Sequence, residues 1–287
     1  MYVVAGVTGN TGSVVASELL ARGAAVRVIV RSESKGASWK ARGAEVAVAS
    51  VEDAEALARA LDGAQGAYLL LPPDASATDF IASRKRLAQT LAQAVERAQI
   101  PHVVFLSSIA AHLPGGTGPI ESVHHGERIL GALKGRTTFL RAAYFLDNWA
   151  AVLPVAEKDG ALPSFVPADL RIPMVSTRDI GRTAARALLA PPERTQVIEL
   201  AGPEDVRPAD IAAQLGRLFG REVKVQAYPP QAAATAFTSF GFSSHMAQLY
   251  AEMYEAIAAG RCVFERPAQV TRDEIPLGDA LRQLLGR

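Results

Sequence analysis

The stretch that most constrains this chain lies at its start. Residues 3–20 read VVAGVTGNTGSVVASELL, in which a β-branched run enters a glycine-rich loop and an amphipathic helical pattern follows at once. The first glycine permits a tight turn, the second lets the backbone approach phosphates, and the third lets the helix pack close to the strand. Phosphates then meet free N–H groups at the positive end of the helix dipole. This order of elements predicts a dinucleotide site formed by Gly6, Thr8, Gly9, Asn10, Thr11 and Gly12.

The glycine spacing, G-x-x-G-x-x-G, differs from the G-x-G-x-x-G of the dehydrogenase fingerprint. Together with its surroundings, residues 6–32, the motif resembles the short-chain dehydrogenase/reductase superfamily and, within it, the atypical NmrA-like group. Later segments resemble the same group and extend the similarity over most of the chain: FLSS (105–108), LRAAYFLDN (140–148), VSTRDIG (175–181) and ELAGPEDVRPADIAAQL (199–215). The glycine motif is specific for the superfamily, and the later segments are specific for the group.

The fold that we predict is a doubly wound α/β Rossmann fold with a mostly parallel sheet in the strand order 3-2-1-4-5-6-7. A small, mostly helical lobe would bind the substrate, and the ligand cleft would lie between the two parts. The Rossmann domain would comprise residues 1–142 and 174–201, and the lobe residues 143–173 and 202–287. The helix expected from VSTRDIG carries Asp179 in its first turn, where an acid suits the helix dipole.

The residue after the second predicted strand, 25–30, bears on the choice of cofactor. In this topology it faces the adenosine ribose, where a carboxylate binds the 2′-hydroxyl of NAD and a cation suits the 2′-phosphate of NADP. Here the residue is Arg31, whose planar guanidinium matches a phosphate, and Lys35 is a second candidate. We therefore expect NADP(H), which the resemblance also favours. The alternative is that Arg31 is an ordinary surface arginine.

Four further cofactor contacts are expected where strands end. Ser50 follows the third strand and corresponds to the adenine-side contact of the group, although many relatives carry an acid there. Leu71 and Pro72 end an apolar run, 67–71, and would border the nicotinamide ribose. Ser107 and Ser108 end the fifth strand; Ser107 is a candidate cofactor contact. Ser108 stands where the superfamily places a substrate-polarising hydroxyl, and the alternative is that both hydroxyls cap the backbone.

The usual proton donor of the superfamily is missing. No tyrosine is followed by lysine four residues later, and Val123 stands where some NmrA-like reductases carry a lysine four residues before a helical glutamate, here Glu127. His124 could be a proton donor, but adjacent helical residues point about 100° apart, so His124 and His125 cannot both face one site. A surface histidine is the favoured alternative. The Gly- and Pro-rich stretch 113–120 is expected to be a mobile loop over the site.

The substrate is expected to meet the segment that leaves the sixth strand. In the NmrA-like group this segment lines the substrate pocket, and its candidates here are Tyr144, Phe145 and Asn148, with Tyr144 also a catalytic candidate. Plain core aromatics are the alternative. An apolar wall in the lobe either forms the outer side of the pocket or is core between the lobes; it comprises Phe237, Phe240, Phe242, Met246, Tyr250 and Met253.

Composition excludes several kinds of partner. The net charge is +1 and 21% of the residues are charged, so no nucleic-acid or acidic-lipid partner is expected. The sequence has no run of 18 apolar residues and no leader pattern, so we expect neither a membrane span nor a cleaved leader. The single Cys262 suggests a reducing compartment, the cytoplasm. No Cys/His spacing suggests a metal. A homodimer remains possible.

These features predict an NADPH-dependent reductase of a small, electron-poor acceptor such as a quinone. Reducing a simple ketone creates a basic alkoxide that needs a positioned acid, whereas hydride addition to a quinone gives a phenolate-like anion that water can protonate. The protein then need only bind the cofactor and stack a flat acceptor against it. The resemblance agrees, because the NmrA-like group includes quinone reductases without the Tyr/Lys pair. The alternative is a redox-sensing regulator that binds NADP without turnover.

Overall fold

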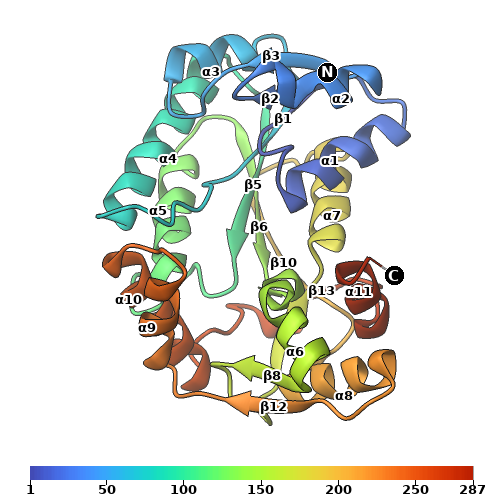
Figure 1. The fold of residues 1–287 in the computed structure, drawn as a ribbon. Helices are drawn as coiled ribbons and strands as arrows, with labels where there is room; N and C mark the ends of the chain where they lie inside the picture. Colours follow the sequence, from blue (N-terminus) through green and yellow to red (C-terminus); the bar gives the residue numbers. More distant parts are fainter. Residues whose placement is uncertain (287) are drawn as a thin grey trace.

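The computed structural model describes residues 1–286 and has an eight-stranded parallel sheet at its centre (Figure 1). The strand order is β13-β10-β6-β5-β4-β1-β2-β3, which confirms the predicted order of seven strands, with β10 as the seventh. The C-terminal β13 adds an eighth strand beside β10 that was not predicted. The bounds are Tyr2–Val4 (β1), Val26–Val30 (β2), Glu45–Val48 (β3), Gly66–Leu69 (β4), His102–Ser108 (β5), Arg136–Ala142 (β6), Gln196–Ala201 (β10) and Thr271–Arg272 (β13).

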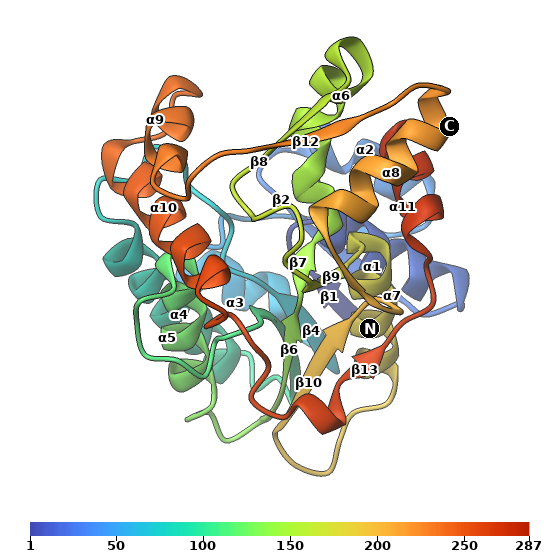
Figure 2. The ribbon, with the colours of Figure 1, turned by 90° about the horizontal axis from the view of Figure 1, so that it is seen from below.

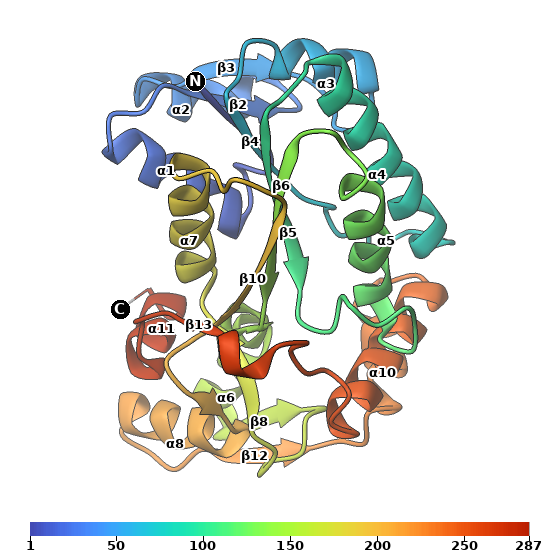
Figure 3. The same ribbon diagram turned by 180° about the vertical axis from the view of Figure 1, so that it is seen from behind.

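Helices cover both faces of the sheet, so the fold is the predicted doubly wound α/β Rossmann fold. α1, α2 and α7 pack on one face, and α3, α4 and α5 pack on the other (Figures 1 and 3). Successive strand residues point to opposite faces, so Val4 contacts the first layer and Val3 the second. The bounds are Asn10–Ala21 (α1), Glu33–Ala41 (α2), Ala54–Leu61 (α3), Phe80–Arg97 (α4), Glu121–Leu130 (α5) and Thr177–Leu189 (α7).

The predicted lobe contains more strands than its sequence indicates (Figure 2). β7, β9 and β11 form one small sheet, and β8 pairs with β12, the one strand expected there. Pro163 and Pro173 lie within β8 and β9, and proline argues against a strand because it lacks an N–H donor. The elements are Tyr144–Phe145 (β7), Leu146–Val152 (η2), Leu153–Asp159 (α6), Ala161–Ser164 (β8), Ile172–Val175 (β9), Asp205–Val206 (β11), Pro208–Phe219 (α8), Lys224–Ala227 (β12), Ala232–Ser239 (α9), Ser244–Ala258 (α10), Pro267–Gln269 (η3) and Leu277–Leu284 (α11).

The lobe has a hydrophobic core of its own, which includes Trp149, Leu162 and Ile211. Two segments after residue 202 nevertheless return to the Rossmann part, because β13 pairs with β10 and Phe264 belongs to the hydrophobic core that also contains residues of α1 and α7. The division of the chain at 142/143 and 201/202 therefore stays a proposal. The segments around Phe264 and β13 follow residue 202 but pack with the Rossmann part. Within residues 1–286, each helix is too short or too polar to cross a bilayer.

Asp179, in the first turn of α7, is buried rather than placed at an exposed helix end. The residue is 1% exposed, and among residues 1–286 no donor lies within hydrogen-bonding distance of its carboxylate oxygens in good geometry, although the Ser176 hydroxyl and the backbone N–H of residue 275 are near enough to act on its pKa. Burial, with a contribution from the nearby Asp273 carboxylate, raises the pKa of this carboxyl to about 6. The favourable dipole effect expected from the sequence is therefore outweighed by the loss of water around the charge.

We expect Asp179→Asn to raise the free energy of unfolding at pH 8 and to leave it unchanged near pH 3. An acid whose folded pKa, here about 6, exceeds its ordinary value of 3.8 increasingly destabilises the fold as the pH rises between the two. The full effect is at most ~3 kcal/mol. Urea unfolding at both pH values measures the change, and an equal change at both would contradict this account. Asp210→Asn is the control of opposite sign and should lower the free energy of unfolding at pH 8, because the hydrogen bond with Arg207 lowers the pKa of Asp210.

Candidate functional site

The glycine-rich turn lies at the carboxyl end of β1, directly before α1. Gly6 adopts a left-handed conformation, with φ at +69°, which side chains other than glycine rarely adopt. A Cβ at Gly12 would lie 2.6 Å from the carbonyl carbon of Gly6 and 2.7 Å from the oxygen of Ala5. These two glycines are therefore required by the turn and by the close approach of α1 to β1.

The remaining residues of the motif form an exposed set and a buried one. Thr8, Gly9 and Asn10 are exposed, so the first turn of α1, whose N–H groups lack partners within the helix, is accessible to a phosphate. Thr11 is 7% exposed, and its hydroxyl accepts a 2.9 Å hydrogen bond from Tyr68 on β4. The side chain of Thr11 thus joins the helix to the sheet, while the exposed set is free to meet a ligand.

The other predicted cofactor residues follow the strands β2, β3 and β4. Arg31 is exposed directly after β2. Ser50 follows β3, and its hydroxyl accepts a 3.2 Å hydrogen bond from the N–H two residues later. Leu71 lines a pocket, and the carbonyl of Pro72 accepts a 2.7 Å hydrogen bond from the buried Arg84 on α4. All four predicted residues lie at the carboxyl edge of the sheet.

A pocket of about 270 Å³ opens beside the carboxyl ends of β4, β5 and β6. Four residues predicted for catalysis or substrate binding line it: Ser108, Tyr144, Phe145 and Asn148. The structure thus brings these side chains together next to Leu71. The full lining is Leu71, Pro73, Phe80, Ser108, Ile109, Pro119, Ile120, Ser122, Val123, Ala143, Tyr144, Phe145, Asn148, Ile172, Pro173, Met246, Tyr250, Met253, Ile257 and Cys262.

Tyr144 is held in the pocket wall by a second tyrosine. The hydroxyl oxygens of Tyr144 and Tyr254 are 3.2 Å apart, so one hydroxyl donates to the other. Burial raises the pKa of both phenols, and it raises the pKa of Tyr250 as well. These side chains therefore remain neutral near pH 7, and the phenols of Tyr144 and Tyr250 are available as hydrogen-bond donors to a carbonyl oxygen in the pocket.

Three predicted residues do not line this pocket. The Nδ1 atom of His124 lies 2.9 Å from the carbonyl oxygen of Ala111, in a separate groove, and His125 lies 3.6 Å from Glu121. Phe240 is 73% exposed at the end of α9. The pocket therefore holds Tyr144 without a histidine beside it. Across residues 1–286, no three His, Cys, Asp or Glu side chains are placed to hold a metal ion.

The predicted mobile loop at 113–120 is instead packed against α10. A Cβ at Gly118 would overlap the carbonyl oxygen of Leu249, and Thr117 is fully buried. The loop ends in the short helix η1, Gly118–Ile120, whose last two residues line the pocket. The glycines that suggested mobility are used here for close packing, so the segment is a wall of the pocket.

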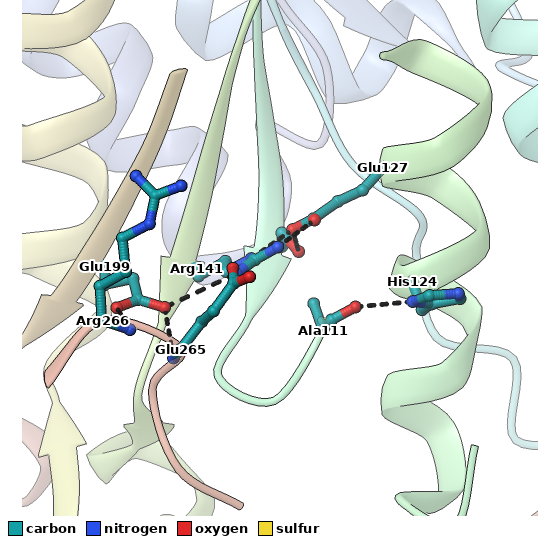
Figure 4. Close-up of polar contacts among 8 residues, drawn as sticks. Ala111, His124, Glu127, Arg141, Glu199, Glu265 and Arg266 are labelled. Carbon is teal, nitrogen blue, oxygen red and sulfur yellow. Dashed lines mark hydrogen bonds and ion pairs between the residues drawn. The ribbon is translucent and has the colours of Figure 1, made fainter. Parts of the chain in front are cut away.

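A buried charged cluster lies near the carboxyl ends of β5, β6 and β10 (Figure 4). Arg141 donates to both carboxylate oxygens of Glu127, at 2.9 and 2.7 Å, and to Glu265 at 2.6 Å, while Glu199 lies 3.6 Å away. Ser107, predicted to contact the cofactor, donates to Glu127 at 2.6 Å. Burial acts against the charge on Arg141, but its hydrogen bonds with Glu127 and Glu265 raise its pKa.

The same cluster holds the C-terminal part of the chain against the sheet. Glu199 accepts hydrogen bonds of 2.8 and 2.9 Å from the N–H groups of residues 265 and 266. This segment crosses from α10 towards β13 below the ends of β5 and β6 (Figure 3). It carries Cys262 into the pocket lining. The cluster therefore holds the segment 262–266, which forms one side of the pocket, at the edge of the sheet.

Three residues of the predicted apolar wall, Met246, Tyr250 and Met253, line the pocket, whereas the cluster around Arg141 was not predicted from the sequence. α10 presents Met246, Tyr250, Met253 and Ile257 to the pocket. Their spacing of four, three and four residues places them on one helix face, which is a signal that the sequence carries. The cluster around Arg141 has no such signal, because its members come from segments far apart in the chain.

The strand order and the glycine-rich turn are those of the short-chain dehydrogenase/reductase class. A sequence model of the NmrA-like family matches residues 2–263, so the chain belongs to the NmrA-like family. It is 25% identical over 262 residues to an NAD(P)H azoreductase of Xenophilus azovorans, covering 88% of this chain and 86% of that protein. It is also 25% identical over 256 residues to quinone oxidoreductase 2 of Escherichia coli K12, with 88% and 86% covered.

Solved structures have the same fold. The crystal structure of the NADPH-dependent quinone oxidoreductase of Escherichia coli complexed with NADPH superposes with a TM-score of 0.83. The match covers 99% of this chain and 100% of that one at 23% sequence identity. The Rossmann part and the lobe are thus arranged as in a known enzyme structure.

Proposed function

We propose that this protein is an NADPH-dependent reductase that transfers hydride to a small, flat, electron-poor acceptor such as a quinone. The observation that carries the proposal is the adjacency of two sites, the accessible first turn of α1 and the apolar pocket, along one carboxyl edge of the sheet. Ligands of open α/β sheets bind at this edge. The activities named for the azoreductase and the quinone oxidoreductase support the same conclusion. We also propose the cytoplasm, because Cys262 is a free thiol.

The predicted residues take distinct roles in this proposal. Backbone groups of the Gly6–Gly12 turn would hold the pyrophosphate, Arg31 the 2′-phosphate and Ser50 the adenine side. Leu71 and Pro72 would border the nicotinamide ribose. Ser107 would support the cofactor site through its hydrogen bond to Glu127. Tyr144, Phe145 and Asn148 would hold the acceptor. A pocket of about 270 Å³ suits one or two fused rings, since sites for drug-sized ligands span roughly 300–1,000 Å³.

The reaction balances without a protein acid. When bound, NADPH supplies one hydride, which carries both electrons, and is left as NADP⁺. The quinone becomes a hydroquinone anion, and a proton from water completes the hydroquinone. The hydroxyls of Ser108 and Tyr144 can donate hydrogen bonds to the oxygen on which the charge develops, which orients the acceptor and stabilises that charge.

Arg31 tests the choice of cofactor. We expect Arg31→Ala to weaken NADPH binding by about 10- to 150-fold and to leave NADH binding nearly unchanged, because it removes a charge-assisted hydrogen bond of about 1.5–3 kcal/mol. Titration by nicotinamide fluorescence with both cofactors measures the two affinities. Arg42→Ala, an exposed arginine at the end of α2, is the control and should change neither. Equal weakening of both cofactors by Arg31→Ala, or of neither, would refute the assignment.

The absence of an essential acid is a second test. We expect His124→Ala, His125→Ala and Tyr144→Phe each to keep kcat with a quinone within about tenfold, or ~1.4 kcal/mol in the barrier. General acid catalysis would be worth about 10²–10⁴-fold. The measurement is kcat at saturating NADPH and quinone, with a pH profile. A loss of a hundredfold or more in one variant, with folding and NADPH affinity intact, would show that a protein acid exists.

The same assay separates the reductase from a redox-sensing regulator. Both bind NADPH, but only the reductase consumes it when an acceptor is added. A panel of quinones mixed with the protein and NADPH should lower the absorbance of the reduced nicotinamide. Binding of NADPH without turnover of any acceptor would favour the regulator.

A further inference from the structure

We propose that the acceptor pocket selects uncharged molecules and rejects anionic ones, a selectivity that rests on the proposed reductase function. Within residues 1–286, the pocket is lined by 20 residues, none of which is Asp, Glu, Lys, Arg or His. An anionic substituent on a bound ring would therefore lose its water without gaining a cation. A neutral ring of the same shape loses no such interaction.

The titratable groups in the lining do not supply charge either. Tyr144 and Tyr250 are phenols whose pKa burial raises, and burial raises the pKa of the Cys262 thiol to about 11. The remaining polar groups are hydroxyls and one amide, including Ser108 and Asn148. Such groups bind a quinone oxygen well, but they cannot neutralise a sulfonate.

The charged residues of α5, which borders the pocket, are turned away from it. On α5, Ser122 and Val123 line the pocket, whereas His124, Glu127 and Arg128 line the separate groove on another face of the same helix. Glu127 is fully engaged by Arg141 and Ser107 (Figure 4). Helical spacing thus separates the neutral and charged faces of α5.

Two charged side chains outside the lining, Arg261 and Glu252, lie near the loop at 113–120. A Cβ at Gly116 would lie 2.8 Å from a terminal nitrogen of Arg261 and 4.0 Å from a carboxylate oxygen of Glu252. Both side chains therefore meet this loop next to the pocket wall formed by Pro119 and Ile120. Neither side chain lines the pocket, although the charge of Arg261 acts on the Cys262 thiol against the burial that raises its pKa.

The test compares two naphthoquinones of similar size, 2-methyl-1,4-naphthoquinone and 1,4-naphthoquinone-2-sulfonate, with the intact protein and NADPH. The sulfonate withdraws electrons and is the easier of the two to reduce, so a preference for the neutral quinone must come from the pocket. After subtraction of the uncatalysed rates, we expect kcat/KM to be at least ~100-fold higher for the neutral quinone, which is ~2.7 kcal/mol. Comparable values for both would overturn the selectivity.

If neither quinone is reduced, the proposed reductase function is refuted. A binding experiment then still tests the selectivity of the pocket. Cys262 is the only cysteine and lines the pocket, so its alkylation by N-ethylmaleimide reports occupancy. The redox-inert pair 2-acetylnaphthalene and naphthalene-2-sulfonate serves as the probe. We expect the ketone to slow alkylation at concentrations at least tenfold below those at which the sulfonate does. Equal protection by both would overturn the proposal.

A gain of function completes the test. Asn148 is exposed and lines the pocket, so a lysine there keeps its solvation and can reach an anionic substituent. We expect Asn148→Lys to narrow the preference for the neutral quinone by at least tenfold, through a lower KM for the sulfonate. Asn148→Gln is the matched neutral control and should keep the preference. A preference unchanged in Asn148→Lys would show that charge at the pocket does not set the selectivity.

Discussion

Gly9→Val is expected to remove measurable NADPH binding while leaving the protein folded. Gly9 lies before the first turn of α1 with φ −105° and ψ 177°, an extended conformation that valine adopts readily. Among residues 1–286, apart from the adjoining residues, only the carbonyl oxygen of Gly6 lies within 4 Å of a Cβ built there, at 3.4 Å, which is an ordinary contact. The added methyl groups would instead occupy the space in which the pyrophosphate approaches the helix N-terminus. A loss of at least ~1,000-fold, about 4 kcal/mol, is expected.

Titration by nicotinamide fluorescence and a thermal melt measure the two parts of this prediction. Ala21→Val is the control, because Ala21 is exposed in the last turn of the same helix and should tolerate the two carbons by which valine exceeds alanine. Gly12→Val is the opposite case, since its Cβ would meet the backbone of Gly6 and Ala5 and should unfold the protein. Unchanged NADPH affinity in Gly9→Val would reject the phosphate-binding role of the turn.

Arg141→Met is expected to lower the free energy of unfolding by about 3–5 kcal/mol at pH 7. Arg141 is 5% exposed and is the cation around which Glu127, Glu199 and Glu265 gather. Removing it leaves the carboxylates of Glu127 and Glu199, which are largely shielded from water, and the partly exposed carboxylate of Glu265 without a counter-charge. Folded proteins are stable by only about 5–15 kcal/mol, so this single change removes a large share.

Urea unfolding followed by circular dichroism measures the loss. Arg128→Met is the matched control, since Arg128 is exposed beside Glu127 and should change stability by less than ~0.5 kcal/mol. A loss below 1 kcal/mol in Arg141→Met would mean that the cluster does not hold the C-terminal segment in place.

The cluster also gives Ser107 and the segment 262–266 a defined relation to the pocket. Ser107 is tied to Glu127 rather than left open, whereas its neighbour Ser108 lines the pocket. Adjacent strand residues point to opposite faces, so two serines that look equivalent in the sequence separate into different surroundings. Under the proposed function, Ser108 meets the acceptor and Ser107 keeps the strand end in place.

The sequence by itself determined the class of fold and the residues of the nucleotide turn. Glycine spacing, β-branched runs and helical periodicity are local properties, set by backbone sterics and by burial of one face of each element. They predicted the Rossmann sheet, its strand order and the residues at its carboxyl edge. The resemblance to the NmrA-like group supplied Ser108, Tyr144, Phe145 and Asn148 as candidates at the site, and the structure brings these four together in one pocket.

The tertiary structure decided what depends on contacts between distant segments. It placed Phe240 in solvent, turned His124 towards the carbonyl of Ala111, and packed the loop at 113–120 against α10. It also buried Asp179 with no well-placed hydrogen-bond donor for its carboxylate among the described residues and assembled the charges around Arg141 from residues up to 138 positions apart, from Glu127 to Glu265. The free energy of a buried charge is set by the groups around it and not by its position in the chain, so no local pattern can predict it.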